Sequence, residues 1–176
     1  MRWIRLLKPL IFSRFQTKLT ISQTSTLQFS VWLSDIDATI MNHAAMMTVF
    51  ETGRIDYMVR TGFFKLARHK KWYVPIASIN VQFFRPLKVF QKAVLTTRVF
   101  HMTEHFIFME QKITRSGKDV AICMVKCKIK SGRENITTQE VLNFLNAKNI
   151  PAESKELVEL FEKQDKAFKE KFFEKE

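Results

Sequence analysis

The sequence predicts an α+β domain in which one antiparallel sheet wraps around a single long helix. Two observations predict this class: a helical spacing of apolar residues before residue 58, and β-rich segments between residues 76 and 130. The chain has 176 residues, of which 46% are hydrophobic and 26% charged, as expected for one globular domain. A sheet wrapped around one helix buries both apolar faces economically.

The first 25 residues form a basic and apolar segment ahead of the domain, opening with MRWIRLLKPLIFSRF. We expect no signal peptide here, because Lys8 and Pro9 split the apolar stretch and no small-residue cleavage site follows. Two alternatives remain open. The segment makes peripheral contact with a membrane, with Trp3 among the head groups and basic residues on anionic lipid, or it packs on the domain's own surface.

Residues 26 to 33 alternate between apolar and polar side chains, as a half-buried strand requires. After the polar connection SDIDATIMN, Asn42 is a suitable N-cap for a helix over residues 43 to 58. A mid-helix glycine costs about 1 kcal/mol relative to alanine, so Gly53 indicates that this helix lies tightly against the sheet. Residues 63 to 71 extend the helical region. The apolar face of the long helix carries Met46, Val49, Phe50, Gly53 and Tyr57.

Four later segments are rich in β-branched and aromatic residues and predict an antiparallel meander of four strands. Ser116 and Gly117 supply the last hairpin turn. The exposed edges of such a sheet favour pairing with a second copy. The four segments are residues 76–84, 93–102, 106–114 and 120–130.

In the last of these segments, successive side chains point alternately to a packed face and to a solvent-exposed, basic face. Cys123 and Cys127 lie on the packed face, about 13 Å apart by strand rise, which is too far for a mutual disulfide. They predict reduced core residues in a reducing compartment, the cytoplasm. The packed face carries Ala121, Cys123, Val125, Cys127 and Ile129, and the basic face carries Met124, Lys126, Lys128 and Lys130.

The C-terminal region reads as a short helix over residues 138 to 146, a break at Pro151 and an amphipathic helix from residue 153 onward. The tail has an apolar stripe that predicts docking on the body or on a partner, and opposite charges four residues apart that support a helix. We therefore divide the chain into residues 1–25, a central domain at 26–148 and a helical tail at 149–176. The stripe carries Leu157, Phe161, Phe168 and Phe172, and the charge pairs are Glu159–Lys163, Glu162–Lys166 and Asp165–Lys169.

The net charge of +12 is unevenly spread. It amounts to +5 before residue 35, +9 between residues 35 and 152, and −2 beyond. A basic body attracts an anionic partner, such as a nucleic acid, an anionic lipid or a phosphorylated small molecule. No nucleic-acid motif is recognisable, and the aromatic residues alternate as core rather than as a stacking platform, so we expect no nucleic-acid partner. No cysteine–histidine cluster has zinc spacing, so we expect no metal.

Two stretches resemble a known family: VWLSDIDATIMNHAAMMTVFETGRIDYMVRTGFFKLA and NVQFFRPLKVFQ. They are similar to the 4-hydroxybenzoyl-CoA thioesterase-like family, which has the hot-dog fold. The likeness is greatest to the subgroup typified by thioesterase superfamily member 6 and its bacterial relatives. That subgroup has a basic apolar N-terminus, D-x-D before the helix, a G-R-I-D-like segment inside it and an F-R-R/P-L-x-x-F turn. The resemblance covers residues 1 to 148.

The resemblance implies hydrolysis of an acyl-CoA thioester at the interface of a homodimer, or of a dimer of dimers. The second Asp of D-x-D falls on Asp37, which would act as general base or nucleophile. Backbone N–H groups near His43 to Met46 would hold the oxyanion. Coenzyme A would enter only as part of the substrate, so no separate cofactor is expected. The expected location is the cytoplasm, with contact at a membrane surface through residues 1 to 15.

One departure from the family pattern supports an alternative function. Relatives carry H-x-N-N after D-x-D, whereas this chain has Ile40-Met41-Asn42-His43 and a connection one residue shorter. Asn42 then keeps the first Asn, and His43 replaces the second as a donor or adjusts the carboxylate, so the resemblance implies a catalytic site of Asp37, Asn42 and His43. One deleted residue can shift Asp37 by about 3.5 Å, and such a shift can cost about 100-fold in rate. The alternative is a catalytically weak hot-dog protein that binds acyl-CoA or lipid.

Other polar residues have candidate roles of lower specificity. Arg85, Lys88 and the cluster from Arg68 to Lys71 are candidates for the anionic nucleotide end of coenzyme A. Asp35 suits a turn or cap, and Glu51 is a second candidate carboxylate, because other hot-dog enzymes place theirs mid-helix. The remaining residues have structural expectations: Arg54 and Asp56 pair with other elements, and His101 and His105 flank a hairpin turn at the surface.

Overall fold

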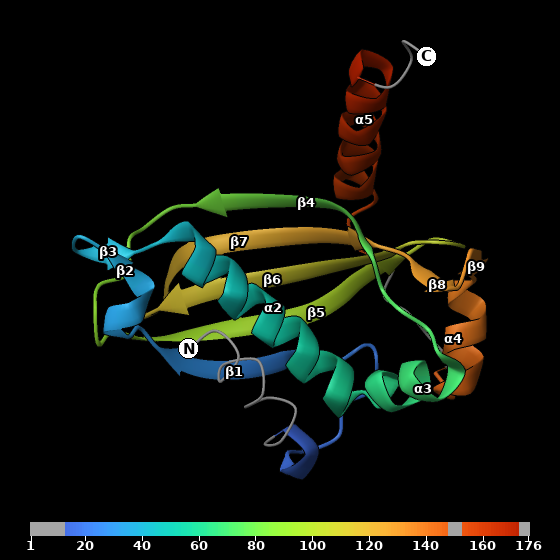
Figure 1. The fold of residues 1–176 in the computed structure, drawn as a ribbon, viewed down its shortest axis with the longest axis horizontal. Coiled ribbons are helices and arrows are strands. Elements are labelled where there is room, and N and C mark those ends of the chain that lie inside the picture. The colour runs from blue at the N-terminus through green and yellow to red at the C-terminus, as the bar shows by residue number, and fades with distance from the viewer. Residues whose placement is uncertain (1–12, 148–152, 173–176) are drawn as a thin grey trace.

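The computed structural model describes residues 13–147 and 153–172. It contains a five-stranded antiparallel sheet with one long helix, α2 (His43–Arg60), lying across one face (Figure 1). This confirms the predicted α+β hot-dog architecture. The strands, in spatial order, are β1 (Ser25–Ser30), β5 (Lys92–Met102), β6 (Ile107–Arg115), β7 (Lys118–Cys127) and β4 (Ile76–Phe83).

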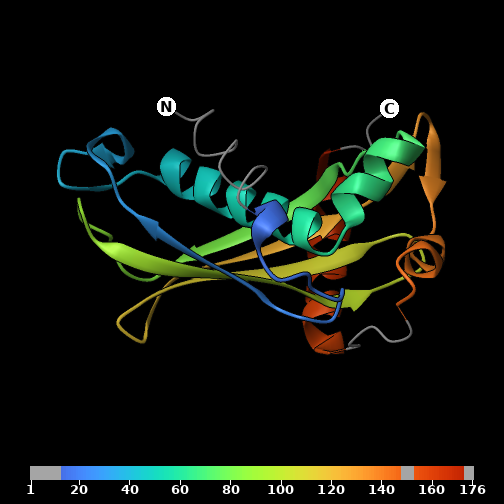
Figure 2. The same ribbon diagram turned by 90° about the horizontal axis from the view of Figure 1, so that it is seen from below.

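Shorter elements surround this core. Figure 2 shows α2 and α3 together on one side of the sheet. Among the described residues, no helix is long and apolar enough to cross a membrane. The predicted membrane contact falls mainly on residues 1–12, which lie outside the described residues. The shorter elements are η1 (Ser13–Phe15), η2 (Leu33–Asp35), β2 (Ile36–Asp37), β3 (Ile40–Met41), α3 (Phe63–Lys70), β8 (Ile129–Ser131), β9 (Glu134–Ile136), α4 (Thr138–Phe144) and α5 (Lys155–Phe172).

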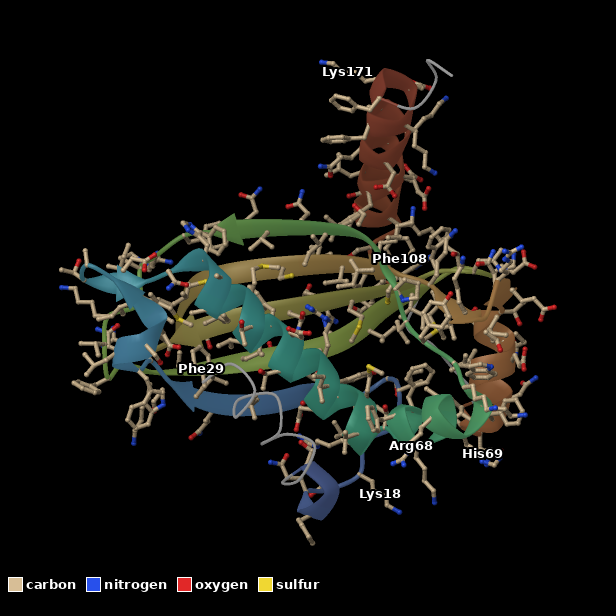
Figure 3. All side chains as sticks on the ribbon, in the orientation of Figure 1. Lys18, Phe29, Arg68, His69, Phe108 and Lys171 are labelled. Carbon is tan, nitrogen blue, oxygen red and sulfur yellow. The ribbon has the colours of Figure 1, made fainter. Side chains whose placement is uncertain are left out.

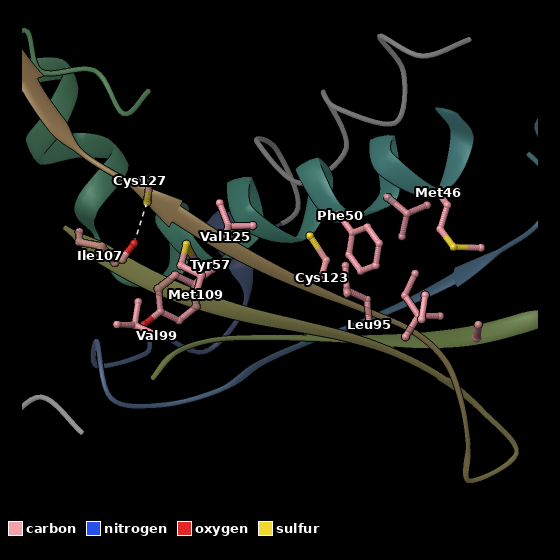
Figure 4. Close-up of a cluster of buried hydrophobic side chains, with 14 of the residues drawn as sticks. Met46, Phe50, Tyr57, Leu95, Val99, Ile107, Met109, Cys123, Val125 and Cys127 are labelled. Atoms are coloured by element: carbon pink, nitrogen blue, oxygen red, sulfur yellow. Dashed lines mark hydrogen bonds between the residues drawn. The ribbon is translucent and has the colours of Figure 1, made fainter. Parts of the chain in front are cut away.

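The main core lies between α2 and the sheet (Figure 4). Phe50 and Leu95 are almost completely buried there. A Cβ atom built on Gly53 would lie 2.4 Å from Leu95 Cδ2 and 2.8 Å from Thr97 Oγ1, closer than atoms can pack. The tight approach predicted from Gly53 is therefore confirmed, and it lets the middle of the helix sit directly on β5.

A buried polar cluster fixes the C-terminal half of α2. The carboxylate of Asp56 is fully buried and accepts hydrogen bonds from the hydroxyls of Ser13 and Ser25. Arg60 Nη1 lies 3.6 Å from the same carboxylate. The hydroxyl of Tyr57 donates to the carbonyl oxygen of Ile21. The expected structural role of Asp56 is confirmed, since it joins the helix to η1 and to the first residue of β1.

The predicted four-strand meander is wrong in one respect. β5, β6 and β7 do form a meander, but β4 pairs with β7 at one edge of the sheet, not with β5. The connection from β4 to β5 therefore crosses the width of the sheet, and β1 pairs with β5 at the other edge. Strand patterns alone could not reveal this, because the apolar alternation of β4 suits either neighbour.

The predicted wet face of β7 is also corrected. Lys126 is only 3% exposed, because α5 covers it. Its Nζ lies 2.8 Å from Glu162 Oε1 and 2.7 Å from Asp165 Oδ2. Burial lowers the pKa of Lys126, but the hydrogen bonds to the two carboxylates outweigh it, and the net shift is upward. The segment also breaks at Lys128, so Ile129 belongs to β8.

The tail helix docks on the body as expected, but only Phe161 of the predicted stripe is buried there, together with Val158. Val158 and Phe161 are buried against Phe100 and Phe108 on the outer face of the sheet. Glu162 and Asp165 bind Lys126, whereas the described i,i+4 ion pair in α5 is Lys166–Glu170. The other members of the predicted stripe stay exposed: Leu157 40%, Phe168 57% and Phe172 63%.

Candidate active site

The start of α2 is built by a tight hairpin and a side-chain cap. Asp37 of β2 faces Ile40 of β3 across a two-residue turn, where Ala38 has a φ of 55°. Left-handed backbone is unfavourable for alanine, so the shortened connection is held in a strained turn. The Asn42 side chain accepts a hydrogen bond of 2.7 Å from Ala45 N, which confirms Asn42 as the N-cap.

Asp35 and Asp37 have different surroundings although they are two residues apart. Asp35 is 5% exposed, and its Oδ2 accepts a hydrogen bond of 2.7 Å from Trp32 N. It closes the η2 turn, as its predicted capping role requires. Asp37 is exposed, and Asn42 Nδ2 lies 3.4 Å from its Oδ1. Asp37 is therefore the carboxylate of the D-x-D pair that a small molecule can reach.

The helix start also leaves backbone donors without helical partners. The Ala45 N–H is taken by the Asn42 side chain, and the Met46 N–H donates to the Asn42 carbonyl oxygen. No hydrogen bond within the described residues uses the N–H of His43 or Ala44. The expected group of donors from His43 to Met46 is thus reduced to these two, at the positive end of the helix dipole.

A groove of about 550 Å³ runs along α2 from the N-cap to Arg54. Asp37 does not line it, but its neighbour Asn42 does. Glu51, the second candidate carboxylate, lies in the groove. Residues spaced by three or four along α2 form this second stripe, and that spacing was the available signal. The helix contributes Ala44, Ala45, Met47, Thr48, Glu51 and Arg54, and Ser34, Asp35 and Ile76 complete the lining.

At the far end of the groove, Arg54 forms a polar contact with the buried side chain of Gln111. Arg54 Nη1 donates to Gln111 Oε1 at 2.7 Å, and Gln111 Nε2 donates to the Phe50 carbonyl oxygen at 2.8 Å. Burial lowers the pKa of Arg54. Burial also raises the pKa of Cys123 to about 11 and that of Cys127 to about 12, so neither thiol is poised as a nucleophile.

The three predicted cationic contacts lie in different places. Lys88 is exposed, and its backbone forms a bridge with Ile40, which places it beside the β2–β3 hairpin. Arg85 Nη1 donates to the Asp119 carbonyl oxygen at 2.5 Å. Arg68 lies in α3, beyond the opposite end of α2 (Figure 3). Within one chain, Lys88 is near Asp37 and Arg68 is not.

In the part of the chain that the structure describes, no hydrogen bond or ion pair joins a histidine to Asp37. His43 is exposed, and its ring packs edge-on against Phe83 of β4 with 4.8 Å between the centroids. His105 is an exposed turn residue, as expected. His101 is half-buried against Phe108, so its predicted surface position is only partly correct. Among the described residues, no three His, Cys, Asp or Glu side chains form a group that could hold a metal ion.

Solved structures share this architecture. The probable thioesterase of Bartonella henselae aligns with a TM-score of 0.60 and 22% identity, covering 65% of this chain and 98% of its own. YbaW, a probable thioesterase of Escherichia coli, aligns at 0.64 and 16%, covering 69% and 96%. A thioesterase of Thermus thermophilus, solved with coenzyme A and zinc, aligns at 0.59 and 18%, covering 71% and 96%. These likenesses show the fold.

Comparison of the sequence with family models identifies the family of this chain. A search of curated proteins finds no match. The family model of the Thioesterase-like superfamily matches residues 31–154, which is more than half of the chain. This range begins just before the D-x-D hairpin and includes α2 and strands β4 to β7. The protein therefore belongs to the Thioesterase-like superfamily.

Proposed function

We propose that this protein hydrolyses an acyl-CoA thioester, with Asp37 as general base or nucleophile. One observation carries the proposal: an exposed carboxylate, its amide neighbour Asn42 and two free helix N–H groups lie together at one end of a groove. Within the superfamily, the D-x-D and G-R-I-D segments support the subgroup typified by thioesterase superfamily member 6. The buried, protonated cysteines suit a reducing compartment such as the cytoplasm.

The residues present can perform each step. Asp37 removes a proton from water, whose oxygen attacks the thioester carbonyl carbon, or attacks that carbon itself. The N–H groups of His43 and Ala44 stabilise the negative charge that develops on the carbonyl oxygen. The carbon–sulfur bond then breaks, and the coenzyme A sulfur takes up the proton held by Asp37. In the nucleophilic route, the thiolate leaves and takes a proton from solvent, and water afterwards hydrolyses the acyl–Asp37 anhydride.

A second copy would close the groove. β4 pairs with β7 on one side, and no other described strand pairs with its outer edge. Its α2-facing side exposes Ile76 by 46%, Ile79 by 37% and Phe83 by 44%. The other edge strand, β1, exposes polar Thr26 and Gln28. Antiparallel pairing of two β4 strands would cover the apolar side chains and extend the sheet across a homodimer.

The substrate would then lie between the two copies. The groove along α2 suits the acyl part, and Lys88 beside the hairpin suits the phosphates of coenzyme A, with Arg85 near the same loop. The Thermus thermophilus relative is a precedent for coenzyme A on this fold. The role of Arg68 stays a prediction. Arg68 lies in α3, at the far end of α2, so the same ligand would have to extend along the whole helix to contact it.

One observation favours a different essential carboxylate, and another favours a protein that binds acyl-CoA without hydrolysing it. Glu51 lies in the groove itself, whereas Asp37 lies at its rim. Glu51 is therefore the second candidate for the essential carboxylate. Ile40 stands exposed where relatives carry His, beside a strained turn. This favours the alternative of a protein that binds acyl-CoA or lipid with little turnover.

Hydrolysis assays with two matched variants distinguish catalysis by Asp37, catalysis by Glu51 and binding without turnover. Release of free coenzyme A thiol from acyl-CoA esters of different chain lengths is followed for wild type, Asp37→Asn and Glu51→Gln. We expect Asp37→Asn to lower kcat/KM about 100-fold or more and Glu51→Gln to change it less than about 5-fold. Glu134→Gln, on exposed β9, is the control. The reverse ranking assigns the chemistry to Glu51, and saturable binding without turnover in wild type supports the binding protein.

A further inference from the structure

The tail helix crosses the outer face of the sheet strand by strand. Its first turns pack on Phe100 of β5 and Phe108 of β6 through Val158 and Phe161. Its middle reaches β7, where Glu162 and Asp165 bind Lys126. Gln164 Oε1 then accepts a 3.4 Å contact from Asn80 Nδ2 on β4. The helix therefore traverses the sheet from β5 to β4, which is the edge strand.

The last part of α5 extends beyond that edge. Figure 1 shows α5 continuing past β4, and Figure 3 places Phe108 near its base and Lys171 at its free end. The seven residues from 166 to 172 span about 10 Å at helical rise. Neighbouring strands are about 4.8 Å apart, so this length matches two further strands of a continued sheet.

The part of α5 beyond the edge carries an apolar face that no other described helix or strand covers. Phe168 and Phe172 are 57% and 63% exposed and stack with 5.8 Å between their ring centroids. They follow Phe161 by seven and eleven residues, so they continue the face of α5 that packs on the sheet. The side of the helix that rests on this chain's outer face is thus prolonged over the space next to β4.

The first half of α5 is acidic and its second half is basic, so two antiparallel copies of the helix would have complementary charges. Residues 153–162 carry Lys155 against four glutamates, a net charge of −3. Residues 163–172 carry four lysines against Asp165 and Glu170, a net charge of +2. Two copies related by a twofold axis at β4 would place their helices on the same outer face in opposite directions. The basic free end of each helix would then approach the acidic, docked half of the other.

We propose that the free end of α5, residues 166 to 172, is an arm that docks on a second copy of this chain across the β4–β4 junction. The inference rests on the edge pairing proposed above and adds a second contact to it. The arm packs Phe168 and Phe172 on the partner's outer surface. Because α5 already covers its own outer face, the sheets of two dimers cannot stack face to face there at the usual spacing of about 10 Å.

Dimer affinity measured by analytical ultracentrifugation tests the arm in the full chain. We expect the double variant Phe168→Asp/Phe172→Asp to raise the dimer Kd about 10- to 100-fold. Both side chains are exposed in one chain, so circular dichroism should be unchanged. Phe15→Asp, at an 86% exposed position in η1, is the matched control and should leave the Kd unchanged. Ile79→Lys, on the edge strand, should weaken the same dimer.

The other outcomes separate the arm from the edge pairing. A wild-type dimer whose Kd is unaffected by the double variant overturns the arm and leaves the edge pairing intact. A monomeric wild type, or a dimer insensitive to Ile79→Lys, overturns the pairing and the arm with it. Co-sedimentation with phosphatidylcholine–phosphatidylserine vesicles, lost in the double variant while the dimer Kd is unchanged, reassigns the aromatic end to a membrane and overturns the arm.

Discussion

The two ends of α2 differ in how they are held. The C-terminal half carries the fully buried Asp56 and its hydroxyl partners, and Gly53 in the middle lets the helix touch β5. The N-terminal end is held by the Asn42 cap and by a short hairpin with a left-handed alanine. Asp37 and the first two residues of the helix, His43 and Ala44, are exposed there.

With the proposed active site at the open end, one helix would divide stability and chemistry between its two ends. Donors and carboxylates that bind a substrate must stay open to it, so they contribute little to folding. The buried half supplies the free energy that holds the open half in place. Substitutions at the two ends should therefore separate the free energy of unfolding from the rate of hydrolysis.

The largest effect is expected at the buried end. Asp56→Ala leaves the hydroxyls of Ser13 and Ser25 without their acceptor and removes the partner of Arg60. We expect a loss of about 3 kcal/mol in the free energy of unfolding, measured by urea denaturation. Asp37→Ala, at the exposed end, should change it by less than about 0.5 kcal/mol. Equal effects at the two positions would contradict the division.

A smaller change in the free energy of unfolding is expected for Gly53→Ala, and its sign shows whether the helix contacts the sheet tightly. Helix propensity alone predicts that Gly53→Ala stabilises the protein by about 1 kcal/mol. The new methyl group would instead overlap Leu95 and Thr97, and overpacking costs about 1–3 kcal/mol. We expect a net destabilisation of about 1 kcal/mol in thermal or urea unfolding. A stabilised variant would show that α2 and β5 are not in tight contact.

The open end can be probed through its cap. Asn42→Ala removes the acceptor for the Ala45 N–H and should cost about 1 kcal/mol of unfolding free energy. Asn42→Asp keeps a cap of similar strength but replaces the amide beside Asp37 with a second carboxylate. Full stability with reduced thioester hydrolysis in Asn42→Asp would sharpen the contrast. Unchanged hydrolysis in both variants would remove Asn42 from the site.

Local patterns predicted most elements of the fold. The N-cap at Asn42, the start of α2 at His43 and the hairpin turn at Ser116-Gly117 follow from residue types within one or two turns of chain. Gly53 even predicted the close contact between helix and sheet, because a mid-helix glycine needs such a reason. The groove face of α2, with Glu51 and Arg54, was less visible, because its helical spacing joins small, polar and charged side chains and not a continuous apolar stripe.

By itself, the sequence determined the α+β class, the extent of α2 and the D-x-D candidate, because these depend on neighbours a few residues apart. Only the tertiary structure decided that β4 lies beside β7, that Lys126 is buried under α5, and that α5 runs past the edge of the sheet. Each of these depends on contacts between distant parts of the chain: Lys126 and Asp165 are 39 positions apart, and Asn80 and Gln164 are 84 apart. At such separations an apolar or charged pattern shows that a face is to be covered, but does not show which segment covers it.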